Sequence, residues 1–95
     1  MANIILLIPE SLYDLSDGNK ELCINASTVG NALFELRFEY KELSERLITS
    51  EGQIRNFINI YLGKDNIRTL NGLETTLCEG DTLLIVKALL TSTRQ

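Results

Sequence analysis

The sequence predicts an α+β domain in which a four- or five-stranded mixed sheet packs against one main helix. Aliphatic runs typical of buried strands stand near both ends of the chain, at 3–8 and 82–88. Between them, residues 28–40 have apolar side chains at helical spacing. Turn signals separate the remaining segments. The predicted order is therefore strand, strand, helix, strand, short strand, strand.

The first two strands form a predicted hairpin with a long loop. "NIILLIP" is rich in β-branched and aliphatic residues, and Pro9 ends it. "ESLYDLSDGNK" contains Asp17-Gly18, a turn signal, and leads into "ELCIN", the second strand.

The helix is predicted from the stretch "STVGNALFELRFEYKEL", where Ser27 or Thr28 can cap the first turn. Its core-facing stripe consists of Val29, Ala32, Leu33, Leu36, Tyr40 and Leu43. Phe34 and Phe38 stand four residues apart on a flanking face. Of a core contact and a partner contact, the core contact is the favoured interpretation of these two phenylalanines.

The later strands follow from alternation and from turn residues. "RNFINIYLG" places Ile58, Ile60 and Leu62 on one side. Phe57, Asn59 and Tyr61 fall on the other side. A short edge strand is predicted near 67–70, after which Gly80-Asp81 turns the chain into "TLLIVKA", the last strand.

The first and last strands are apolar on both faces, which is typical of central strands covered on both sides. One helix covers only one face, so apolar side chains are expected on the other. These are Ile5, Leu7, Leu84 and Val86, joined by Phe57 and Tyr61. A patch of this size usually marks an interaction site, although loops 10–19 or 63–78 could also fold over part of it.

Composition excludes several classes of function. With 44% hydrophobic and 23% charged residues, the 95-residue chain is an ordinary single globular domain. Its net charge of -4 comes without a basic stripe, which argues against nucleic-acid binding. The opening apolar run is too short for a membrane span or a signal peptide, so a cytoplasmic protein is expected.

Nothing in the sequence suggests a metal, a cofactor or a catalytic group. The chain has no histidine, the commonest general base and metal ligand. Cys23 and Cys78 lie far apart without local companions, and both are expected to be reduced thiols. Glu21 and Glu79 stand near them, whereas a reactive thiol needs an electropositive neighbourhood. A thiol enzyme is therefore the least favoured of the functions considered.

The chain resembles the ubiquitin-like sulfur-carrier proteins over nearly its whole length. The residues that indicate this are "TVGNAL", "YKELSERL" and "RNFINIYLGKDNIRTLNGLETTLCEGDTLLIV", in that order. The family includes the small subunit of molybdopterin synthase, the thiamine sulfur carrier and the carrier of a cysteine-biosynthesis route, which is the most similar. The resemblance implies a β-grasp fold, with a domain over 1–90 and a tail over 91–95.

The resemblance also implies a particular chemistry at the C-terminus. Family carriers end in Gly-Gly, whose terminal carboxylate an activating enzyme adenylates with ATP before sulfur is transferred to give a thiocarboxylate. Glycine lets such a tail thread a narrow channel. In this sequence, the Gly-Gly position falls on Thr91 and Ser92.

Two functions follow from these observations. The departure at Thr91-Ser92 favours a non-catalytic adaptor or regulator that binds a sulfur-, cofactor- or amino-acid-metabolism enzyme through the open sheet face. The alternative is a sulfur carrier with an atypical terminus, whose partner is an activating enzyme. Self-association through the apolar face is also compatible with the pattern.

Overall fold

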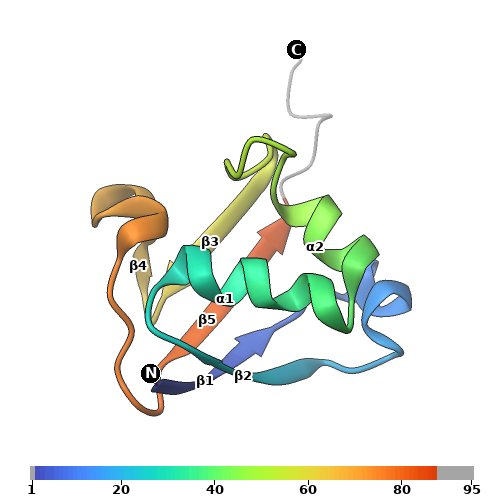
Figure 1. Cartoon of the computed structure of the whole chain (residues 1–95), viewed down its shortest axis with the longest axis horizontal. Coiled ribbons are helices and arrows are strands. Elements are labelled where there is room, and N and C mark those ends of the chain that lie inside the picture. Colours follow the sequence, from blue (N-terminus) through green and yellow to red (C-terminus); the bar gives the residue numbers. More distant parts are fainter. Residues whose placement is uncertain (1, 88–95) are drawn as a thin grey trace.

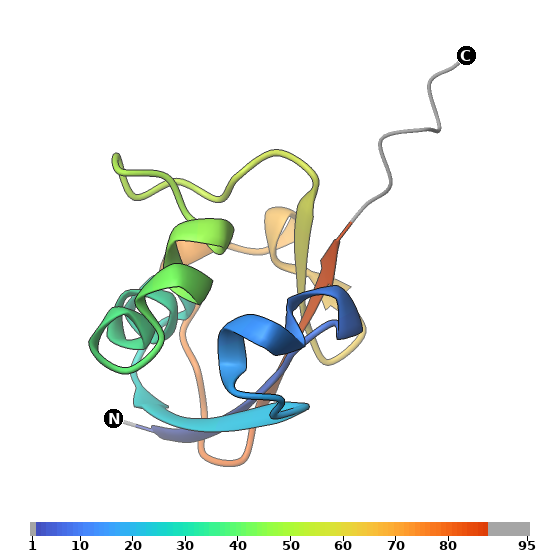
Figure 2. The same ribbon diagram turned by 90° about the vertical axis from the view of Figure 1, so that its right-hand side faces the viewer.

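The fold is one mixed five-stranded sheet with helices on one face (Figure 1). The structure, a computed structural model, describes residues 2–87. The strands are β1 (Ala2–Leu7), β2 (Glu21–Ala26), β3 (Ile58–Leu62), β4 (Asp65–Asn66) and β5 (Thr82–Lys87), in the spatial order β2-β1-β5-β3-β4. The helices α1 (Val29–Glu35) and α2 (Lys41–Leu47) lie together on the same side of this sheet (Figure 2).

The two apolar strands lie at the centre, as predicted. β1 and β5 are parallel neighbours, with Leu6 paired to Leu83 and Leu7 to Leu84. β1 also pairs antiparallel with β2, and β5 pairs antiparallel with β3. This confirms the predicted fold class, and the arrangement is the β-grasp that the resemblance implied.

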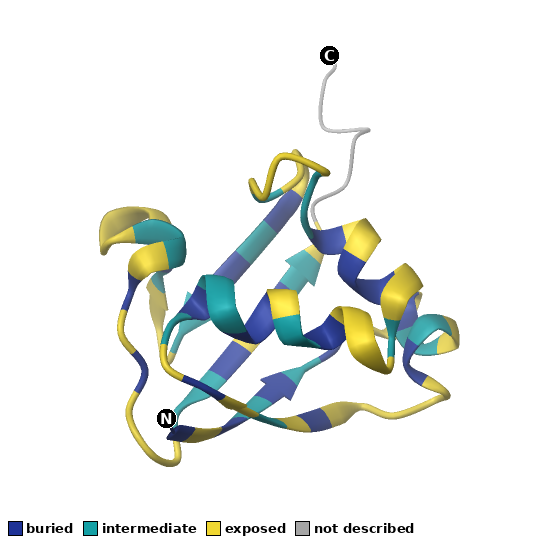
Figure 3. Cartoon of the chain, in the orientation of Figure 1, coloured by how far each residue is buried: buried dark blue, intermediate teal, exposed yellow. Residues whose placement is uncertain are grey.

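The core lies between the sheet and the helices, where alternate strand residues are buried (Figure 3). The sheet contributes Ile4, Leu6, Ile58, Ile60, Leu83 and Ile85, and the helical segment contributes Val29, Ala32, Leu33, Leu36, Leu43 and Leu47. The predicted helix stripe is thus buried, apart from Tyr40, which is half-buried. Thr28 accepts a hydrogen bond from the Asn31 N–H at 3.1 Å, so it is the residue that caps α1.

The helix predicted over 28–40 is shorter than expected, and a second helix that was not predicted follows it. α1 ends at Glu35 and continues as a 3₁₀ turn, η2 (Leu36–Phe38), before α2 begins at Lys41. A straight helix over 29–47 would be about 28 Å long, whereas a six-residue strand is only about 20 Å long. The break therefore keeps the later apolar residues over the sheet. The buried Ser44 hydroxyl ties the two parts together by donating to the Leu33 carbonyl oxygen at 3.1 Å.

Three smaller predictions are also corrected. β3 begins at Ile58, so Phe57 precedes the strand, with a positive φ of 73°. The short edge strand is Asp65–Asn66, and the 3₁₀ turn η3 (Ile67–Thr69) follows it where the strand was expected. Phe34 and Phe38 are not core residues, because 47% and 66% of their surface is exposed.

The two long loops pack on the helix side of the molecule. The 3₁₀ helix η1 (Glu10–Ser16) contacts α2 and places Leu12 in the core. In the second loop, the 3₁₀ turn η4 (Gly72–Glu74) contacts α1. The alternative that these loops cover the apolar sheet face is therefore wrong.

Candidate functional site

The open face is the surface of the sheet opposite the two helices. Its side chains come from the positions of β1, β5 and β3 that alternate with the core residues. The face is most apolar along one row, where Leu7 of β1 pairs with Leu84 of β5 and Leu84 pairs with Tyr61 of β3. This row crosses the three central strands without interruption.

Polar residues bound the row on both sides. Leu7 pairs with Glu21 on β2, and Tyr61 pairs with Asn66 on β4, so the outer strands contribute a carboxylate and an amide. Leu84 is 38% exposed at the centre, whereas Leu7 and Tyr61 are half-buried. An apolar centre with a polar rim is the usual anatomy of a protein interface.

Two more predicted residues extend the apolar area. Ile5 and Val86 are both half-buried and belong to the same alternation as Leu7 and Leu84. Ile5 pairs with Thr82, and Val86 pairs with Asn59, so each has a polar neighbour on β5 or β3. The structure therefore brings five of the six predicted patch residues together on three adjacent strands.

Phe57 is the sixth, and it lies outside the sheet. It is 50% exposed in the segment that leads into β3. Its left-handed backbone takes it out of the alternation that predicted its place. A contribution of Phe57 to partner binding remains a prediction that rests on its exposure alone.

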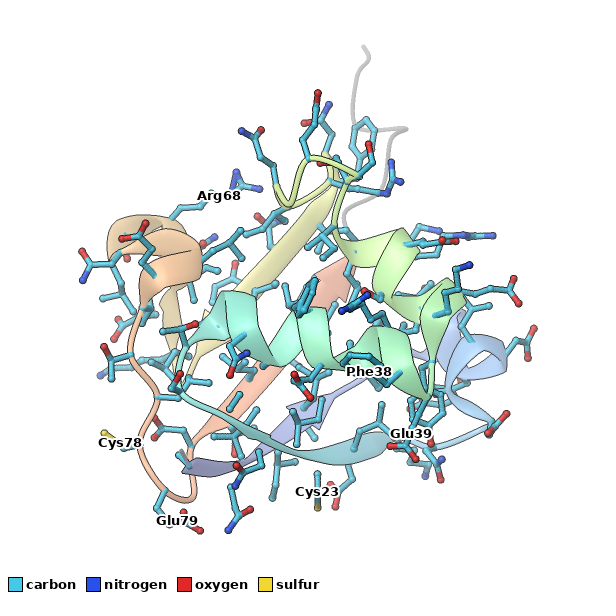
Figure 4. The ribbon with its side chains drawn as sticks, viewed as in Figure 1. Cys23, Phe38, Glu39, Arg68, Cys78 and Glu79 are labelled. Atoms are coloured by element: carbon cyan, nitrogen blue, oxygen red, sulfur yellow. The ribbon has the colours of Figure 1, made fainter. Side chains whose placement is uncertain are left out.

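A polar clasp joins the start of β1 to the turn before β5. The backbone N–H of Asn3 and its side-chain amide donate to the two carboxylate oxygens of Glu79, at 3.0 and 3.1 Å. The Asn25 amide donates to the Asn3 side-chain oxygen at 2.9 Å. The hydrogen bond from the Asn3 backbone, followed by the one from its side chain, lowers the pKa of Glu79 from its ordinary value of 4.5. Figure 4 labels Glu79 in the turn before β5.

The tail residues Thr91 and Ser92, which stand at the predicted Gly-Gly position, lie outside the described residues, as does the expected packing of 88–90. The described chain reaches Lys87, which pairs with Ile58 at the end of the central strand β5. Val86 and Leu84 are therefore the residues of the open face that are closest in sequence to the tail.

Within residues 2–87 there is no cluster of three or more metal-ligating side chains. Cys23 and Cys78 are both exposed and are not bonded to each other. None of the helices in the described part is long and apolar enough to cross a membrane.

The sequence interpretation missed an exposed aromatic cluster on the helix side. The Arg37 guanidinium carbon lies 3.9 Å from the centre of the Phe34 ring and 4.4 Å from that of Phe38. The two rings are edge-to-face, with centres 6.5 Å apart. An arginine between two phenylalanines at helical spacing is a signal for this arrangement, because all three side chains then share one helix face.

No family model matches the chain. Three known proteins resemble it closely. Sulfur carrier protein CysO of Mycobacterium tuberculosis is 32% identical over 88 residues, which span 90% of this chain and 95% of that protein. Its crystal structure superposes with a TM-score of 0.84 at 31% identity, over 92% of this chain and all of that one.

The other two are known from their structures. In the crystal structure of the Amycolatopsis orientalis BexX/CysO complex, the matching chain has a TM-score of 0.84 and 28% identity, over 90% of this chain and 96% of that one. The small archaeal modifier protein 1 of Methanosarcina acetivorans has a TM-score of 0.83 and 26% identity, over 95% of this chain and 96% of that one.

Proposed function

Because this chain belongs to the ubiquitin-like sulfur-carrier family, we propose that it is a sulfur-carrier protein that a partner enzyme recognises through the open face. The observation that supports this most is the row Leu7–Leu84–Tyr61. It is the apolar centre of the open face, and its residue Leu84 lies on the last strand, seven positions before Thr91 in sequence. The complex in which a CysO is bound to a second protein supports the proposal that a carrier of this fold has protein partners.

The reaction that we propose takes place at the C-terminal carboxylate. A partner enzyme would transfer the adenylyl group of ATP to this carboxylate, with release of pyrophosphate. A sulfide donor would then displace AMP, leaving a thiocarboxylate. In this scheme the carrier contributes no catalytic residue, and its role is to dock and to present its terminus.

The open face suits this docking role because its apolar area is displayed on a rigid central part of the sheet. Burying the exposed part of Leu84 together with Leu7 and Tyr61 would remove apolar surface from water, which favours association. Central anchors of this kind typically dominate the binding free energy. A partner seated on Leu84 and Val86 would contact the strand that precedes the tail in sequence.

A second candidate function is a non-catalytic adaptor that uses the same face without carrier chemistry. The observation that favours it is the pair Thr91-Ser92 at the family Gly-Gly position. A Cβ at each position reduces the number of backbone conformations that the tail can adopt. It also makes the tail thicker, which hinders its passage through a narrow channel. The sulfur-carrier relatives favour the first function over this one.

Intact-protein mass spectrometry separates the two functions. The natural chain and a Thr91→Gly/Ser92→Gly variant that ends at residue 92 would each be incubated with a family activating enzyme, ATP and a sulfide donor. The carrier proposal expects both chains to gain the mass of one oxygen-to-sulfur exchange at the C-terminus. Modification of the glycine variant alone would support the adaptor, because the scaffold would then be recognised while the natural tail fails.

A further inference from the structure

A groove of about 410 Å³ runs between β2 and the segment that follows α1, away from the apolar row of the open face. One wall is the stretch from Glu21 to Asn25 on β2, and the other consists of Glu35, Leu36, Phe38, Glu39 and Tyr40. β2 is one of the two edge strands of the sheet, and β4 is the other. In Figure 4, Phe38 and Glu39 lie on the side of the β2 ribbon opposite to Cys23.

The main chain of β2 has unused hydrogen-bonding groups along this groove. Ile8 N–H donates to the Lys20 carbonyl oxygen at 2.8 Å, which makes Ile8 and Lys20 a hydrogen-bonded antiparallel pair. Such pairs alternate along a ladder, so Leu22 and Ile24 also bond to β1. The N–H and C=O groups of Glu21, Cys23 and Asn25 therefore point away from β1, and no other backbone group in residues 2–87 pairs with them.

The groove is negatively charged. It is lined by three carboxylates, those of Glu21, Glu35 and Glu39, and no lysine or arginine lines it in the described part of the chain. Between the carboxylates, Phe38 offers apolar surface, because 66% of this side chain is exposed, whereas Leu36 is buried in the core. This combination fits a side chain with an apolar stem and a cationic head, because the stem can pack against Phe38 while the head reaches a carboxylate.

We propose that this groove binds an extended basic peptide, which adds to the sheet as a strand beside β2. The exposed main-chain groups of Glu21, Cys23 and Asn25 supply the hydrogen bonds, and every second peptide side chain, a lysine or an arginine, faces Glu35 and Glu39. Charge complementarity selects this occupant over an acidic or neutral peptide. The site shares Glu21 with the polar rim of the open face but does not include the apolar row Leu7–Leu84–Tyr61.

Hydrogen exchange measured by NMR gives a test with an alternating signature. The probe is a short synthetic peptide of alternating lysine and valine, with both ends blocked. Its addition should slow exchange of the amides of Glu21, Cys23 and Asn25. The amides of Leu22 and Ile24, which already bond to β1, should change little. A glutamate–valine peptide and a backbone N-methylated lysine–valine peptide are the controls, and neither should protect these amides.

Matched variants test the two parts of the site. Glu35→Gln/Glu39→Gln should weaken peptide binding about 3- to 10-fold, whereas Glu42→Gln, an exposed position of α2 outside the groove, should have no effect. Cys23→Pro removes an outward N–H, which an edge strand tolerates, so this variant should fold and lose binding. If Cys23→Pro fails to fold, Glu35→Gln/Glu39→Gln and the alternating pattern of amide exchange still test whether the peptide binds beside β2.

Three results would overturn the proposal. The first is the absence of protection at millimolar lysine–valine peptide. The second is equal binding of the glutamate–valine peptide, which would remove the role of the carboxylates. The third is protection of the same three amides in the absence of peptide, if this protection increases with protein concentration. In that case β2 would pair with a second copy of the chain.

Discussion

Two adjacent leucines of β5 show how the sheet divides its residues between stability and binding. Leu83 is fully buried under the helices, while Leu84, on the other face, is 38% exposed. Leu83→Ala should lower the free energy of unfolding by about 2–5 kcal/mol, as deletions of buried methyl groups do. Leu84→Ala should lower it by much less and should instead weaken partner binding. Chemical denaturation of both variants checks this, and equal losses of stability would contradict the assignment of the two faces.

Glu79 should make the stability of the fold dependent on acid pH. Its hydrogen bonds from Asn3 hold its folded pKa below the ordinary value of 4.5. The folded state therefore favours the carboxylate, and this stabilisation is complete above pH 4.5 and disappears as the pH falls from there through the folded pKa. In denaturation curves on either side of that pH, Glu79→Gln should lose less stability on acidification than the natural chain.

Glu74→Gln is the matched control for Glu79, because Glu74 is exposed and lies outside the clasp. This control should keep the acid dependence of the natural chain. The interpretation of the clasp would be wrong if Glu79→Gln and Glu74→Gln followed the same curve.

At the scale of elements, one buried hydroxyl connects α2 to α1 across the break between them. Ser44 is 4% exposed and donates to the Leu33 carbonyl at the point where η2 interrupts the helix. Ser44→Ala leaves that buried carbonyl without this donor, which should lower the free energy of unfolding by about 1–3 kcal/mol. Glu45→Ala, at the exposed neighbouring position, should change it by less than about 0.5 kcal/mol. Thermal unfolding of the two variants measures the difference, and equal losses would remove the role of the hydroxyl.

The sequence predicted the strands well because their signals are local. Aliphatic runs on both faces placed β1 and β5 at the centre, and Asp17-Gly18 lies at the predicted turn, with positive φ at both residues. The helix break was missed because Leu36, Tyr40 and Leu43 continue the periodic spacing of Val29 and Leu33 through it. The same apolar spacing is compatible with one straight helix and with two shorter helices that pack on the same core.

The open face was largely predictable, and its exception has a backbone cause. Period-two alternation selected Ile5, Leu7, Tyr61, Leu84 and Val86, and the sheet places these on one side. Phe57 continued the pattern in sequence but adopts a positive φ, which alternation does not reveal. The groove beside β2 was not predictable, because it depends on how far the segment after α1 lies from the edge strand.

At the scale of the whole molecule, the fold separates three surfaces. The helices bury one side of the sheet, the apolar row occupies the other side, and the acidic groove lies along the β2 edge. The tail follows the central strand, whose residues Leu84 and Val86 belong to the open face. A partner on the apolar row can therefore contact the strand that precedes the tail in sequence, while the groove between β2 and the segment after α1 lies at the edge of the sheet.

The rate of ATP-dependent thiocarboxylate formation at the C-terminus tests this account most directly. Intact-protein mass spectrometry would follow the natural chain, Leu84→Asp on the open face and Glu39→Gln in the groove, each with a family activating enzyme and a sulfide donor. We predict equal rates for the natural chain and Glu39→Gln, and a rate at least about tenfold lower for Leu84→Asp at subsaturating enzyme, because an interface anchor is lost. An unmodified natural chain, or a Leu84→Asp variant modified at the natural rate, would contradict it.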